Sequence, residues 1–147
     1  MKQNEGHTIQ NMPIGLRPKS VKELASRYMS GEESRILYGD FLDAFYAMSY
    51  QEKARSLAEE PIGLLEYDQI FAVTLAATVE ELAESCEVNV PSWVTADKYY
   101  LSSDEAMFGV IPASEIDEDS RQWFKKQSPK SFTKRNIFVS SNALARA

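Results

Sequence analysis

The sequence has little of what most catalytic and metal-binding sites require. Its 147 residues contain one histidine, His7, and one cysteine, Cys86. A structural zinc site needs about four Cys or His ligands, so we expect no metal here. A catalytic thiol needs an electropositive setting, but Glu84 and Glu87 flank Cys86, which we therefore interpret as a structural residue. We expect no cofactor.

Glycine-rich loops and long apolar runs are also absent. The six glycines are isolated, so neither G-x-G-x-x-G nor G-x-x-x-x-G-K-[ST] occurs. No window of 18 apolar residues exists, which excludes a transmembrane helix, and residues 1–19 lack the apolar core of a secretory signal. A lone cysteine suits a reducing compartment. These observations predict a cytoplasmic protein with no membrane partner.

What the chain does have is material for a core and an uneven distribution of charge. Hydrophobic residues make up 44% and charged residues 26%, which is typical of a soluble domain of this length. Residues 1–119 carry nine basic and 22 acidic residues (net −13), whereas residues 120–147 carry seven basic and no acidic ones (net +7), giving −6 in total. The basic segment either packs against the acidic body or forms a surface for an anionic partner.

Serine followed three residues later by glutamate predicts where helices begin, because this spacing fits the capping box. Four such pairs occur: Ser20–Glu23, Ser30–Glu33, Ser49–Glu52 and Ser102–Glu105. They predict helices over 21–30, after Ser30 to about 48, from 50 to before Pro61, and from 103 to Gly109. Further helices are expected over 66–87 and 115–127. In the 66–87 helix, Glu80 and Glu84 lie opposite an apolar stripe, which predicts an amphipathic surface helix.

The second half of the chain has a different character from the first. Residues 89–147 are irregular, rich in aromatic residues and basic at the end, and 137–139 could form a short strand. We therefore predict a mainly α fold: a flexible N-terminal arm over 1–19, then a single-domain helical bundle over 20–147. Its regular helices span 20–88, and its irregular half, 89–147, contains one or two very short strands.

Two DNA- or RNA-binding interpretations arise from these patterns. Helices meeting near Gly31 suggest a helix-turn-helix, but four acidic residues on the second helix would repel phosphate. In the basic segment, aromatic residues alternate with cations, an arrangement that can bind single-stranded nucleic acid. However, Lys130 and Lys134 share a helix face from which Phe132 points away, which favours a core role for the aromatic ring.

The end of the chain carries a recognisable series of motifs. They are P-x-W-V at 91–94, S-P-x-x-F-x-x-R-N-I-F-V at 128–139 and L-x-R-A at 144–147. These motifs resemble the ending of a family of small bacterial proteins that look like antitoxin-like partners of nucleotidyltransferase-type toxins. The resemblance covers about the last 57 residues. It implies another protein as partner, and we take the following as candidate partner-binding residues: Trp93, Lys130, Lys134, Arg135, Asn136 and Arg146.

Two of these candidates have a clear physical role. Arg135 offers a planar fork of donors suited to a carboxylate or phosphate, and Asn136 tolerates the left-handed conformation that closes a helix. Our leading hypothesis is a non-enzymatic, cytoplasmic protein that binds another protein and has an antitoxin-like role. A homo-oligomer is compatible with this hypothesis. The alternative is a nucleic-acid-binding protein that uses the basic 121–146 segment. An enzyme with a carboxylate site is a third hypothesis, and it requires a deep acidic pocket.

Overall fold

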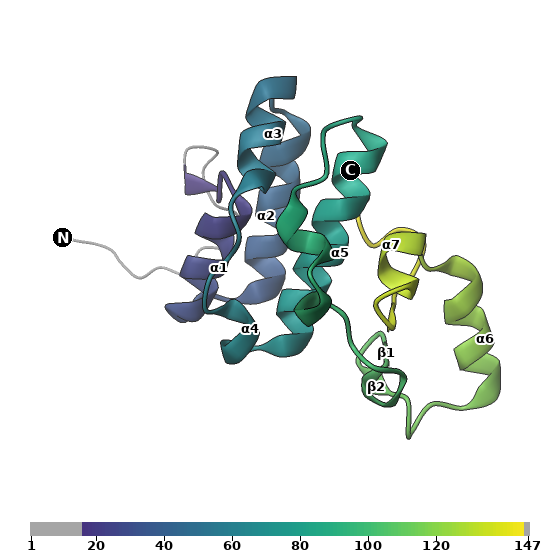
Figure 1. Ribbon diagram of the computed structural model, residues 1–147. Helices are drawn as coiled ribbons and strands as arrows, with labels where there is room; N and C mark the ends of the chain where they lie inside the picture. Colours follow the sequence, from purple (N-terminus) through teal and green to yellow (C-terminus); the bar gives the residue numbers. More distant parts are fainter. Residues whose placement is uncertain (1–15, 146–147) are drawn as a thin grey trace.

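The computed structural model describes residues 16–145 and shows a mainly α-helical chain, as predicted (Figure 1). Its α-helices are α1 (Val21–Met29), α2 (Ser34–Tyr46), α3 (Tyr50–Ala58), α4 (Leu64–Tyr67), α5 (Gln69–Ser85), α6 (Glu118–Gln127) and α7 (Lys130–Thr133). Short 3-10 turns are η2 (Ser92–Thr95), η3 (Asp97–Tyr99) and η4 (Ser103–Glu105). The strands are β1 (Met107–Phe108), β2 (Ile111–Pro112) and β3 (Ile137–Phe138).

Helix α5 lies in the middle of the molecule. In Figure 1, α1, α2 and α3 lie on one side of it and α7 on the other, with α6 and the strands beyond α7. Leu75 and Val79 belong to the larger core cluster, while Val73 and Ala77 belong to a second cluster shared with Phe132 of α7. The predicted surface helix is therefore wrong: α5 is buried on two faces, because α7 covers the side that carries Glu80.

Two of the helix starts predicted from serine are correct, those at Ser20 and Ser49. Ser20 accepts a hydrogen bond from the Glu23 amide, and Ser49 forms a complete capping box with Glu52. Ser30 is different, since it ends α1 instead of starting α2. Gly31, with φ +113°, turns the chain there, and α2 begins only at Ser34. The serine-to-glutamate spacing at Ser30 was therefore misleading.

Two other helices start later than their periodicity suggests. The expected 66–87 helix is divided at Asp68, whose side chain accepts from the Phe71 amide and so caps α5 after the single turn of α4. Likewise, Asp117 accepts from the Ser120 amide at 2.8 Å and caps α6, so Glu115 precedes the helix while Glu118 and Asp119 lie in its first turn. In both cases an aspartate N-cap sets the boundary, because it satisfies an otherwise unpaired helical amide.

A small three-stranded sheet, in the order β2-β1-β3, replaces the helix expected after Ser102. The Ser102–Glu105 capping box closes only the single turn η4. Residues 107–108 then pair antiparallel with β2 and parallel with β3, which confirms the strand expected near residue 137. Phe108 of β1 stacks on Phe138 of β3 with ring centroids 4.5 Å apart, and this cross-strand contact reinforces the pairing of the two strands.

The first and second halves of the chain share one core. Trp93, Val94 and Tyr99 from the second half join the same cluster as the residues of α1 and α2. Most of the predicted arm, residues 1–15, lies outside the described residues, but Pro18 is buried and Arg27 Nη1 donates to the Leu16 carbonyl at 2.7 Å. Within 16–145, no helix is both long and apolar enough to cross a membrane.

Candidate functional site

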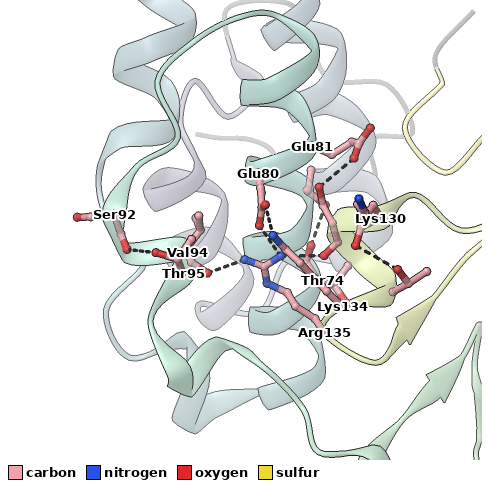
Figure 2. Close-up of polar contacts among 12 residues, drawn as sticks. Thr74, Glu80, Glu81, Ser92, Val94, Thr95, Lys130, Lys134 and Arg135 are labelled. Atoms are coloured by element: carbon pink, nitrogen blue, oxygen red, sulfur yellow. Dashed lines mark hydrogen bonds and ion pairs between the residues drawn. The ribbon is translucent and has the colours of Figure 1, made fainter.

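The most concentrated charge in the interior lies where α7 meets α5 (Figure 2). Arg135 Nη1 is 2.7 Å from Glu80 Oε1, and Lys134 Nζ donates to the other carboxylate oxygen, Oε2. Arg135 is 0% exposed and the Glu80 side chain 6% exposed, whereas the Lys134 side chain remains 41% exposed. One carboxylate of the acidic body is thus held by two cations of the basic segment.

Two hydrogen bonds of the Arg135 guanidinium go to backbone carbonyls of the same chain. Its Nη1 donates to the Ser131 carbonyl at 2.8 Å, and its Nη2 donates to the Val94 carbonyl at 2.6 Å. The guanidinium carbon lies 4.5 Å from the centre of the Tyr100 ring, within the range of a cation–π contact. Arg135 was expected to offer its donors to a partner. In the structure it instead joins α5, η2 and α7 of its own chain.

The electrostatics keep Glu80 ionised. Burial raises the pKa of the Glu80 carboxyl, but hydrogen bonds from Lys134 and Arg135 and their positive charge lower it further, so the net shift is downward. A carboxylate with a lowered pKa and two fixed cations is a poor proton donor or acceptor near neutral pH. This arrangement is suited to holding elements together and not to acid–base chemistry.

Two further candidate residues are occupied within the fold. Trp93 is 8% exposed, its Nε1 donates to the Leu57 carbonyl at 3.1 Å, and its ring packs edge-on against Tyr99 at 5.1 Å. Asn136 adopts φ 63°, the predicted left-handed conformation, and its Nδ2 donates to the Leu101 carbonyl at 2.8 Å. Both side chains therefore donate to backbone carbonyls of their own chain.

The remaining candidates differ in what the structure says of them. Lys130 is exposed on α7. The Lys134 side chain is only partly exposed, because its Nζ contacts Glu80. Arg146 lies outside the described residues. Of the basic segment, Arg121 is also used internally: it donates to the Ala113 carbonyl at 3.1 Å and covers the Phe108 ring at 5.0 Å. Only part of the positive charge therefore faces solvent.

An exposed surface lies on α6, which belongs to the basic 121–146 segment already considered for nucleic-acid binding, and on the β1–β2 hairpin, which the sequence interpretation did not single out. We call it the hairpin–α6 surface; its members are Val110 (91% exposed), Ile111 (36%), Trp123 (49%), and the exposed lysines Lys125 and Lys126. Phe124 packs against Phe108 at a ring distance of 6.2 Å and so joins α6 to the hairpin. Two consecutive aromatic residues on one helix were the sequence signal for an exposed ring. Adjacent helical residues point in different directions, so if Phe124 packs inward, Trp123 cannot also do so.

Neither a search for metal-binding clusters nor comparison with known proteins identifies a further candidate site among the described residues. Within residues 16–145, no group of three or more His, Cys, Asp or Glu side chains is arranged to hold a metal ion. Cys86 is partly buried and packs against the larger core cluster. Comparison with protein-family models, with curated proteins and with solved structures found no match.

Proposed function

We propose that this protein binds another protein through the hairpin–α6 surface and has no catalytic activity of its own. The observation that carries the proposal is the exposure of Trp123 and Val110, at 49% and 91%, on a lobe anchored by a packed aromatic cluster. Exposed tryptophan on a rigid element is typical of residues that dominate binding energy at interfaces.

The chemistry of this surface defines the partner. Lys126, three residues after Trp123, lies on the same side of α6 as the indole ring, so the partner should offer an apolar recess bordered by acidic groups. The C-terminal motifs resemble those of antitoxin-like proteins, which supports a nucleotidyltransferase-type toxin in the cytoplasm as the partner. A second copy of the chain is a different outcome of the same experiment.

The test immobilises the full chain and measures its binding to a purified nucleotidyltransferase-type protein from a neighbouring gene of the same genome. Trp123→Ala should weaken binding at least tenfold, because truncating an interface tryptophan removes a large, well-packed contact. Gln122→Ala, the exposed neighbour on α6, should leave affinity unchanged and serves as the matched control. Equal binding by wild type and Trp123→Ala, or no binding by either, would contradict the proposal. Sedimentation of the protein alone reveals a homo-oligomer.

Nucleic-acid binding is the second candidate, and one observation favours it. Lys125, Lys126 and Lys130 are exposed near an exposed tryptophan, which combines phosphate contact with a surface for base stacking. If this function is correct, affinity for single-stranded nucleic acid should fall steeply between low and moderate salt. The triple variant Lys125→Gln, Lys126→Gln, Lys130→Gln should flatten that dependence, whereas an unchanged slope would exclude this surface.

A further inference from the structure

A pocket on the far side of α5 from α6 combines an apolar floor with a basic rim. It lies between the segment before α1, the end of α2 and the start of α3, and has a volume of about 420 Å³. Ala44, Ala47 and Met48 form its apolar part. Arg17, Lys19, Arg55 and one acid, Glu52, supply its charge. Small-molecule sites have volumes of roughly 300–1,000 Å³, so the size suits a small ligand.

The positive charge of the pocket is only partly neutralised. Glu52 is committed to the Ser49 capping box, where its carboxylate accepts from the Ser49 amide at 2.9 Å. Hydrogen bonding to Ser49 and the nearby charges of Arg55 and Lys19 lower the pKa of Glu52, which therefore stays ionised. Three cations against one carboxylate leave an excess of positive charge on a body that is otherwise strongly acidic.

One atom in the pocket is buried without a hydrogen-bond partner. Arg17 Nε is shielded from solvent, and within residues 16–145 no acceptor reaches it. None of the ion pairs found in that range involves Arg17, Lys19 or Arg55. A buried donor left unpaired is unfavourable, and the Arg17 guanidinium is not held in place by a bond from Nε.

We propose that this pocket binds a small organic anion, with a carboxylate or phosphate held by Arg17 and Arg55 and an apolar part resting on Ala44, Ala47 and Met48. Guanidinium groups match the planar or tetrahedral oxygens of such anions through paired N–H donors. Lys19 adds a point charge at the rim. The site is separate from the hairpin–α6 surface and does not depend on the proposed partner.

The direct test follows the Met48 methyl group in the full chain labelled with ¹³C-methyl methionine. Hexanoate and phenyl phosphate serve as anionic probes, hexan-1-ol as the neutral analogue, and inorganic phosphate as an anion without an apolar part. At least one organic anion should shift the Met48 signal saturably, whereas hexan-1-ol and inorganic phosphate should bind at least tenfold more weakly. The Met107 methyl on β1 should not move and controls for general effects. Met48→Leu assigns the signal.

Two variants link the shift to the cations. Arg17→Gln and Arg55→Gln should each weaken binding of the better anionic probe about tenfold, while Lys125→Gln, an equal change of charge on α6, should not. Arg55 is exposed, so that variant should fold even if Arg17→Gln does not. The proposal is overturned if hexan-1-ol or inorganic phosphate binds as well as the organic anions, if Arg55→Gln binds with unchanged affinity, or if Met48 shows no saturable shift.

Discussion

Glu80 is the residue whose environment departs furthest from its place in the helical pattern. It lies on the polar side of α5, yet it is 4% exposed and meets Lys134 and Arg135 from a segment more than 50 residues later. Removing a charge from water is expensive unless the geometry of its partners compensates. Here the carboxylate has a cation at each oxygen, and the guanidinium has two backbone carbonyls as well. Breaking either side leaves the other charge buried.

The Glu80→Gln variant should lower the free energy of unfolding at pH 7 by about 3 kcal/mol, the lower end of the range for breaking a buried pair. The lower end applies because Arg135 keeps its bonds to Ser131 and Val94 and its contact with Tyr100. Glu84→Gln, one turn later on α5 and exposed, is the matched control and should change stability by less than about 0.5 kcal/mol. Urea unfolding measures both. Similar effects of the two variants would contradict this role.

Acidification should reveal the same interaction. The pKa of Glu80 is lower in the folded protein than its ordinary value of 4.5, so its contribution is fully present above pH 4.5. As pH falls through the lowered folded-state pKa, Glu80 becomes protonated and the contribution disappears. The stability difference between wild type and Glu80→Gln should therefore be constant from pH 7 to about 5 and shrink below 4.5. Chemical denaturation across that range measures it, and a difference that grows on acidification would refute the assignment.

At the scale of single elements, the helix caps show how far the local serine-to-glutamate pattern predicts where a helix begins. Ser49 and Ser30 have the same spacing to a glutamate, but only Ser49 stands before a helix. At Ser30 the left-handed Gly31 redirects the chain, and α1 continues up to the serine. The difference depends on where the preceding helix ends, which the four-residue motif does not contain.

The two serines give a matched pair of variants. Ser49→Ala should destabilise the protein by about 1 kcal/mol, because it leaves the Glu52 amide without its capping acceptor. Ser30→Ala should have an effect below about 0.5 kcal/mol, since its hydroxyl only donates to the Ser26 carbonyl at an exposed helix end. Thermal unfolding followed by circular dichroism compares them. An equal loss in both variants would contradict the cap assignments.

Longer elements show the same division. The helical class, most helices of the first half and the strand at 137–138 were predictable, because periodicity and caps are local signals. The burial of α5 on two faces and the strand at 107–108 were not, since each depends on a partner supplied by residues 130–138. Tertiary contacts here override the local preference.

At the scale of the whole molecule, the charge asymmetry is resolved in two ways. Lys134 and Arg135 pack against the acidic body, as one of the two interpretations held, while Lys125, Lys126 and Lys130 stay exposed. The candidate list from the sequence could not tell which side chains turn inward. Trp93, Arg135 and Asn136 look suitable for recognition, and only their tertiary surroundings show that they bind their own chain.

Packing and charge in the 121–138 segment can be separated experimentally. Phe132→Ala should destabilise the protein by about 3–5 kcal/mol, because Phe132 is 1% exposed and fills the second core cluster beside α5. The triple variant Lys125→Gln, Lys126→Gln, Lys130→Gln should change stability by less than about 1 kcal/mol, since these side chains are exposed. Urea unfolding measures both. A larger loss in the triple variant would mean that charge, not packing, anchors the segment.

The 54-residue separation between Glu80 and Lys134 has a consequence for the newly made chain. Synthesis at about 5–20 residues per second leaves roughly 3–11 s between the appearance of these two residues. During that interval α7 has not been synthesised and cannot cover α5. If the uncovered face of α5 were entirely apolar, it would favour aggregation. The ionised carboxylate of Glu80 favours hydration of this face during the interval. Glu80 thus makes this face of α5 less apolar until Lys134 and Arg135 have been synthesised.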